Sequence, residues 1–151
     1  MFLFESLLVA LSTYSAIPVP QFEWNDRNMK YAICFFPAVG IFCGTALWGW
    51  SALADLLGIS GFFFAMIATC LPLLITGGIH MDGYMDSVDA LASHQSRERK
   101  LEILKDPNCG AFAVIYCGVY LLAYAGLTHE LFTANCILVI CPTFVLSRSL
   151  S

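Results

Sequence analysis

The chain has 151 residues, of which 59% are apolar and 12% are charged, and its mean hydropathy is +0.76. Charged residues make up about 25% of an ordinary soluble domain, so this composition excludes that class and indicates a membrane protein. The formal net charge is −4, and we expect no nucleic-acid partner.

Apolar stretches follow one another along the chain, and each is continuous instead of alternating with polar residues, which predicts helices and not strands. A helix needs roughly 20 apolar residues to cross the hydrocarbon core. The second and third stretches meet this length, the fourth nearly does, and the first and last are short. They are Met1–Ile17, Tyr31–Leu57, Ile59–Ile79, Ala111–Leu127 and Ala134–Leu146. We predict an all-α, polytopic membrane bundle of about five transmembrane helices, with residues 1–151 forming a single domain.

The first stretch could be taken for a secretory signal peptide. It lacks a basic N-terminal region, however, and Ser15–Pro18 makes a poor cleavage site. We therefore expect Met1–Ile17 to be retained, either as a span or as a helix lying partly in the membrane interface.

The second and third stretches each contain a pair of glycines. Gly40-x-x-x-Gly44 lets two helix backbones approach closely, and we interpret it as packing. Gly77 and Gly78 close the third stretch, where they can end a helix or let a phosphate-bearing ligand approach bare backbone. Both interpretations stay open, and the second makes Gly77 and Gly78 candidate substrate-binding residues.

A polar segment, His80–Gly110, interrupts the apolar chain. It holds 10 of the 18 Asp, Glu, Lys and Arg residues and two of the three histidines. A connection between two membrane helices needs only a few residues. We therefore take residues 80–110 as the candidate catalytic loop.

Three aspartates at the start of this loop follow the spacing D-G-x-x-D-x-x-D. Asp82, Asp86 and Asp89 fall within about 60° of one another on a helix, and like charges one turn apart destabilise an isolated helix. Bound Mg²⁺ would offset this repulsion, since it takes carboxylate ligands together with substrate phosphates. The alternative is a solvated helix start whose dipole favours acids, which accounts for Asp86 and Asp89 but not for Asp82.

A short amphipathic helix is predicted over Ser96–Lys105, with Ser96 as its N-cap. Its cations could recognise phosphate or anionic lipid; for Arg99 and Lys100 we favour the second role. Lys105 and Asp106, at the end of this helix, are the better functional candidates.

His80 is close to the acidic face in sequence but points away from Asp82 on a continuous helix. We consider it a candidate base, a group that supports a ligand, or an interfacial histidine.

The basic residues segregate in this topology. With five crossings, every Lys and Arg falls on one side: Arg27, Lys30, Arg97, Arg99, Lys100, Lys105 and Arg148. The connections Gly58–Ser60 and Thr128–Thr133 carry none. Short basic loops stay cytoplasmic, so we expect the catalytic loop to face the cytoplasm from the bacterial inner membrane.

Taken together, these motifs resemble the cobalamin synthase (adenosylcobinamide-GDP ribazoletransferase) family. The resemblance rests on Gly77-Gly78-x-His80-x-Asp82-Gly83-x-x-Asp86-x-x-Asp89, on Arg97-x-x-x-Leu101-x-Ile103-x-Lys105-Asp106, and on Gly110-x-Phe112. It spans nearly the whole chain, although Ala92–Ser96 replaces the family's usual glycine-rich stretch. Family members are considerably longer, so we expect this chain to be the N-terminal part of a longer domain.

The resemblance implies a reaction in which a hydroxyl of α-ribazole, or of its 5′-phosphate, attacks adenosylcobinamide-GDP and GMP leaves. It implies Asp82 and Asp86 as Mg²⁺ ligands and Asp89 as ligand or general base. Lys105 or Arg97 would stabilise the leaving phosphate. The lipid bilayer is an expected partner, and a homo-oligomer is left open.

Two other classes are weighed against it. A CDP-alcohol phosphotransferase-like enzyme also uses Asp-rich metal motifs, but the Gly77–Gly83 run fits it less well. A non-enzymatic transporter or scaffold subunit predicts ionisable residues deep within spans; only Glu5 and Asp55 approach such positions, and both lie toward the ends of stretches.

Overall fold

The computed structural model describes residues 2–20 and 31–150, and every regular element in these ranges is a helix. The all-α prediction is therefore confirmed for the described part of the chain. The α-helices are α1 (Phe2–Tyr14), α3 (Phe36–Leu57), α4 (Gly61–Thr76), α5 (Ile79–Ala92), α6 (Arg97–Ile103), α7 (Ala111–Thr133) and α8 (Ile140–Ser149). Two 3₁₀ turns, η1 (Ile33–Phe35) and η2 (Ile137–Val139), precede α3 and α8.

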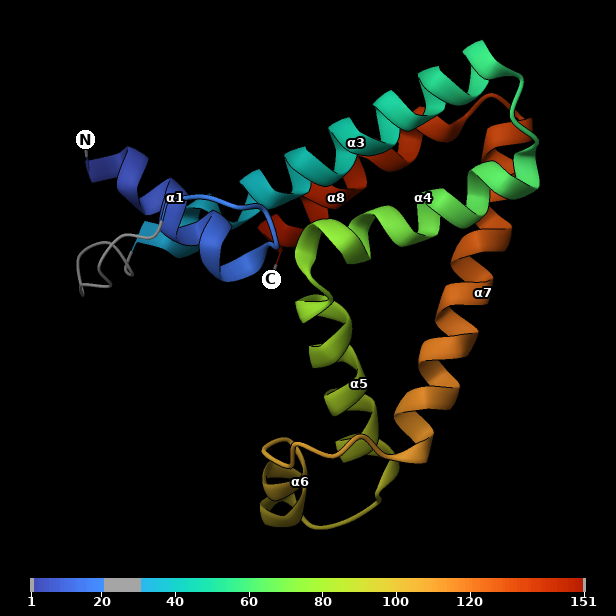
Figure 1. The fold of residues 1–151 in the computed structure, drawn as a ribbon. Helices are drawn as coiled ribbons and strands as arrows, with labels where there is room; N and C mark the ends of the chain where they lie inside the picture. The colour runs from blue at the N-terminus through green and yellow to red at the C-terminus, as the bar shows by residue number, and fades with distance from the viewer. Residues whose placement is uncertain (1, 21–30, 151) are drawn as a thin grey trace.

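Helices α4 and α8 both lie along α3 (Figure 1). A Cβ on Gly40 would lie 2.5 Å from the carbonyl oxygen of Phe144, and one on Gly44 would lie 2.7 Å from that of Cys141. Only glycine permits backbones this close, so the predicted packing role of the pair is confirmed. The buried side chains of Leu47 and Phe64 belong to the core formed beside this contact.

The chain turns sharply between α4 and α5. Gly77 and Gly78 adopt φ values of 62° and 80°, which other residues rarely adopt, and the two helices are bent by 93°. Of the two interpretations left open for Gly77 and Gly78, the one in which they end a helix is therefore confirmed. The helix ends at Thr76 because two consecutive left-handed residues cannot continue it.

Two helical segments are long and apolar enough to cross a membrane, Ile33–Leu57 and Ala111–Thr133, and the bent pair α4–α5 would make a third. Helices α1 and α8 are apolar but shorter. The described residues thus support two or three spans by length and composition, and about five are not confirmed. The apolar helices nevertheless indicate association with a membrane.

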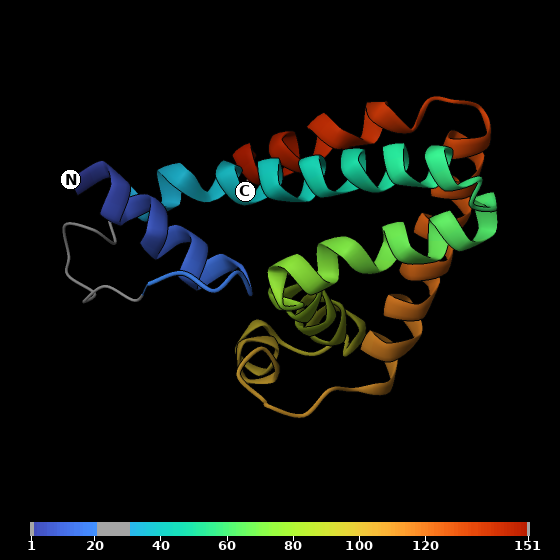
Figure 2. The same ribbon diagram turned by 45° about the horizontal axis from the view of Figure 1, so that its top comes forward.

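The connection predicted at Thr128–Thr133 is wrong, because α7 continues through Thr133. No glycine or proline interrupts those six residues; the helix ends where Asn135 takes a φ of 55°. The α7–α8 turn and the α3–α4 turn lie at the same end of the molecule in both views (Figures 1 and 2).

Among the basic residues, Arg27 and Lys30 lie outside the described residues. The predicted apolar stretch ended at Leu146 and left Arg148 in a polar tail on the basic side; instead Arg148 lies in the last turn of α8, where its side chain is buried. The remaining basic residues lie on α6 or next to it.

Candidate functional site

The glycine bend and the first aspartate of the polar segment line one open hollow. Gly77 and Gly78 form part of its wall, and Asp82, one turn into α5, forms another part. The hollow measures about 560 Å³ and is completed by apolar side chains such as Leu73 and Met85. The structure thus brings together three of the residues that the sequence singled out, and exposed backbone lies beside a carboxylate.

Asp82, Asp86 and Asp89 all lie on α5, as predicted. Seven residues of helix rise about 10 Å, so Asp82 and Asp89 are too far apart along the axis to meet at one ion. Within residues 2–20 and 31–150, no three His, Cys, Asp or Glu side chains are grouped closely enough to hold a metal. Asp82 and Asp86, one turn apart, could supply the one or two carboxylates that Mg²⁺ uses beside substrate phosphates.

Asp89 is engaged differently. One oxygen of its carboxylate accepts a hydrogen bond from the backbone N–H of Gly110, and the other accepts one from that of Ala113 at 3.0 Å. These N–H groups lie at the start of α7, where helical donors lack partners and the dipole favours a negative charge. Asp89 therefore fastens the end of α5 to the start of α7, a role that sequence reasoning missed.

Gly110 allows this junction. A Cβ at this position would lie 2.6 Å from both carboxylate oxygens of Asp89, so no larger residue fits without a shift. The paired occurrence of Asp89 and Gly110 in the sequence motif thus has a steric explanation.

The cations of the polar segment lie at the other end of α5. Helix α6 follows the C-terminal end of α5, away from the bend (Figure 1). The side-chain oxygen of Ser96 accepts from the backbone N–H of Arg99, so the predicted N-cap is confirmed. Arg99 pairs with Glu102 at 2.5 Å, while Arg97 and Lys105 are exposed.

Asp106 shapes the turn after α6. Its Oδ1 accepts from the backbone N–H of Asn108 at 2.9 Å and from the Asn108 amide at 2.7 Å. These hydrogen bonds lower the pKa of the Asp106 carboxyl below its usual range. The predicted substrate-binding residues Arg97, Lys105 and Asp106 are therefore grouped around α6, separate from Gly77 and Gly78.

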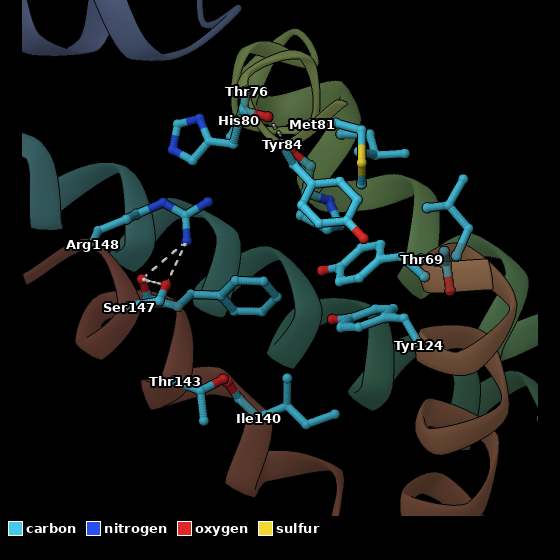
Figure 3. Close-up of a pocket in the computed structure, with 15 residues that line it drawn as sticks. Thr69, Thr76, His80, Met81, Tyr84, Tyr124, Ile140, Thr143, Ser147 and Arg148 are labelled. Atoms are coloured by element: carbon cyan, nitrogen blue, oxygen red, sulfur yellow. Dashed lines mark hydrogen bonds between the residues drawn. The ribbon is translucent and has the colours of Figure 1, made fainter. Parts of the chain in front are cut away.

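His80 lies on the opposite side of α5 from the Asp82 hollow, as expected for residues two positions apart on a helix. It lines a second cavity of about 400 Å³ between α4, α5, α7 and α8 (Figure 3). Its ring also packs against Phe36, with ring centroids 5.3 Å apart. Leu73 and Met81 contribute to the walls of both hollows, so the two are adjacent.

Arg148 and Tyr124 also line this cavity, and sequence reasoning had assigned neither of them a role. A signal was available for both. Extending the last apolar stretch over Arg148 would place an ionisable residue within a span, which marks a functional candidate. Tyr120 and Tyr124 are one turn apart and share a face of α7.

Comparison with known proteins agrees with these motifs. The family described as cobalamin-5-phosphate synthase matches residues 6–151. A protein of Lachnoclostridium phytofermentans named adenosylcobinamide-GDP ribazoletransferase is 49% identical over 147 residues, which cover 97% of this chain and 56% of that protein. A protein of the same name from Clostridium perfringens is 37% identical over 82% of this chain and 50% of its own length. One from Brevibacillus brevis is 36% identical over 84% of this chain and 51% of its own length.

The chain thus spans about half the length of the curated relatives it matches. No solved structure matches it.

Proposed function

The chain belongs to the cobalamin-5-phosphate synthase family, and we propose that it carries the metal- and phosphate-binding part of a membrane transferase. The reaction joins adenosylcobinamide-GDP to α-ribazole or to its 5′-phosphate and releases GMP. The name of the relatives supports this assignment. The observation that carries it is the hollow in which Asp82 lies beside the bare backbone of Gly77 and Gly78.

In this reaction the ribazole hydroxyl forms a new P–O bond at the cobinamide-side phosphorus. The P–O bond to the GMP moiety breaks, and the hydroxyl proton passes to a base. Mg²⁺ held by Asp82 and Asp86 would neutralise charge that develops on the pyrophosphate. Gly77 and Gly78 present backbone without side chains, which lets the phosphates approach closely. Positioning contributes more than covalent chemistry in such transfers.

The other candidate site residues are proposed as the general base or as groups that stabilise the leaving phosphate. Asp89 is proposed as the general base, in addition to its hydrogen bonds to the start of α7, because its distance along α5 from Asp82 excludes it as a further ligand of the same ion. His80 is an alternative base. Arg97 or Lys105 would stabilise the leaving phosphate; because the 14 residues of α5 rise about 20 Å, this role requires α6 to approach the bend when substrate binds.

The experiment is a transfer assay in membranes containing the protein. With adenosylcobinamide-GDP, α-ribazole 5′-phosphate and Mg²⁺, we expect GMP release matched by formation of the joined product. EDTA should stop the reaction, and Mg²⁺ should restore it. Full turnover in EDTA would rule out the metal, and GMP release without joined product would rule out the transfer.

Matched substitutions test the site within the same assay. Asp82→Asn and Asp86→Asn should abolish transfer, whereas Asp55→Asn, an exposed carboxylate in the last turn of α3, should not. Lys105→Ala should lower the rate roughly 10- to 150-fold if it loses a charge-assisted contact. Arg99→Ala, whose partner is Glu102, should change it only a few-fold. Equal losses at Lys105 and Arg99 would indicate a diffuse basic surface instead of a site.

A further inference from the structure

The cavity between α4, α5, α7 and α8 contains a buried arginine for which residues 2–20 and 31–150 supply no counter-charge. Arg148 is only 9% exposed. Its Nη1 donates to the carbonyl oxygen of Phe144 at 3.0 Å and to the Ser147 hydroxyl at 3.3 Å, both on its own helix. Its Nη2 lies 4.0 Å from the sulfur of Cys43. Within the described ranges no Asp or Glu pairs with it.

A guanidinium carries five N–H donors, and burying it without a partner anion costs several kcal/mol. The ring of Phe144, whose centroid is 5.7 Å from the guanidinium carbon, offers only a weak cation–π contact. A bound anion would therefore stabilise the Arg148 guanidinium, and the described side chains do not supply one.

Two other side chains in the same cavity also lack partners. The buried polar atoms without a hydrogen bond in the described residues are His80 Nε2, Tyr124 Oη, Arg148 Nε and His129 Nδ1, and the first three belong to residues that line this one cavity. Figure 3 shows His80 and Arg148 on one side and the Tyr124 hydroxyl directed toward them. Buried polar groups are almost always satisfied, so three in one cavity indicate a missing ligand.

The chemistry of these groups specifies an anion. The guanidinium only donates, the tyrosine hydroxyl donates, and the imidazole donates in its Nε2–H tautomer. The hydroxyls of Thr69 and Thr76 are already bonded to carbonyl oxygens of their own helix. No aspartate or glutamate lines the cavity. Arginine suits phosphate oxygens in particular, because its fork can donate two parallel hydrogen bonds.

The volume of the cavity and its aromatic side chains indicate which chemical group carries the phosphate. At about 400 Å³ the cavity falls in the range of small-molecule sites and exceeds what inorganic phosphate would fill. Tyr84, Tyr120 and Tyr124 follow one another along its wall, with ring centroids 5.7 and 6.1 Å apart. Aromatic rings pair favourably with one another at centroid distances of about 4.5–7 Å, so this wall suits a ligand with an aromatic body.

We propose that this cavity binds a small aromatic phosphate monoester, with its phosphate on Arg148, His80 and Tyr124 and its ring against the tyrosines. The inference rests on the proposed function, whose second substrate, α-ribazole 5′-phosphate, is such an ester, and it adds the side chains that bind it. The ligand would lie beside the Asp82 hollow, since Leu73 and Met81 wall both spaces. The site is distinct from Asp82, Asp86 and the cations of α6.

Binding is measured on the purified protein in detergent micelles without adenosylcobinamide-GDP. Because no transfer occurs under these conditions, absence of binding would contradict this inference without contradicting the proposed transfer reaction. Phenyl phosphate, inorganic phosphate and benzyl alcohol are titrated by calorimetry. In parallel, the protein in nanodiscs with and without phosphatidic acid is titrated with phenyl phosphate. We expect saturable binding of phenyl phosphate, weaker binding of inorganic phosphate, no binding of benzyl alcohol, and little competition from phosphatidic acid.

Substitutions locate the site. Arg148→Gln should weaken phenyl phosphate binding roughly tenfold or more, and Tyr124→Phe, which removes only the hydroxyl, should weaken it about two- to tenfold. Arg99→Gln, exposed on α6, should leave it unchanged. Since a buried arginine can matter for folding, Tyr124→Phe provides a second test that keeps the ring in place.

Three results would overturn the proposal. They are no saturable binding to the wild-type protein, equal losses in Arg99→Gln and Arg148→Gln, and displacement of phenyl phosphate by phosphatidic acid, which would make the cavity a lipid site.

Discussion

Asp89 holds two segments of the chain together with one side chain. Its two oxygens accept from backbone N–H groups more than twenty positions away, at Gly110 and Ala113. A carboxylate at a helix N-terminus satisfies free donors and meets a favourable dipole. The polar segment between α5 and α7 is therefore closed into a loop whose ends are fixed to each other, which limits where α6 and its cations can lie.

Replacing Gly110 by alanine should break this junction. The added Cβ would lie 2.6 Å from the Asp89 oxygens, and overpacking of this kind costs about 1–3 kcal/mol. We expect Gly110→Ala to lower the free energy of unfolding in mixed micelles by that amount and to speed proteolysis of the α5–α7 loop. Gly118→Ala, on α7 with open space around it, is the control. Equal stability of the two variants would contradict the junction.

The Asp106 turn should be insensitive to pH in the physiological range. Hydrogen bonds from Asn108 lower the pKa of the Asp106 carboxyl, so the stability they contribute is complete above the unfolded value of about 3.9. It is lost only as the pH falls through the lower folded value. We expect protection of the Asn108 amide against hydrogen exchange to persist from pH 7 to about 5. Asn108→Ala removes only the side-chain donor and keeps the backbone N–H, which lowers the pKa more, so the pKa of Asp106 should rise only part of the way to the ordinary value. Loss of the wild-type protection above pH 5 would refute this account.

At the scale of helices, two glycine pairs act in opposite ways. Gly77 and Gly78 end a helix because both take positive φ values, and the bend creates the hollow beside Asp82. Gly40 and Gly44 lie within a helix and serve close packing instead. The pairs differ in spacing: adjacent glycines let the backbone change direction, whereas glycines one turn apart form a flat strip for a neighbouring helix.

The α3–α8 contact provides a prediction at this scale. Gly40→Ala would place a Cβ 2.5 Å from the Phe144 carbonyl oxygen, so α8 must move away. We expect a loss of about 1–3 kcal/mol in unfolding by denaturing detergent, followed by circular dichroism. Gly49→Ala on the same helix meets nothing within 4 Å and should be neutral or stabilising by up to about 1 kcal/mol. If the two variants unfold alike, the close packing of α8 on α3 is not present in the membrane.

For the molecule as a whole, the charge distribution predicts an orientation. The α3–α4 and α7–α8 turns lie at one end and carry no Lys or Arg, while α6 carries the cationic cluster. Since short basic segments remain in the cytoplasm, α6 should face it.

Cysteine labelling in a Cys-less background tests this orientation. Gln95→Cys, exposed just before α6, should react with a membrane-impermeant thiol reagent only in permeabilised cells. Thr133→Cys, exposed at the end of α7, should react in intact cells. Reversed labelling of the two positions would reverse the topology.

Periodicity and composition are local properties of the chain, and they were sufficient for the helical class, the α6 cap at Ser96, the packing of Gly40 and Gly44, and the location of Asp82, Asp86 and Asp89 on one helix. They left open whether Gly77 and Gly78 end the third helix, since glycine permits a left-handed backbone without requiring it. Nor could they show that Asp89 meets Gly110 or that Arg148, His80 and Tyr124 share a cavity. Those groups are brought together by packing between helices distant in sequence: α8 packs along α3, and Arg148 thereby faces α5 and α7 across one cavity in which the described residues supply no counter-charge.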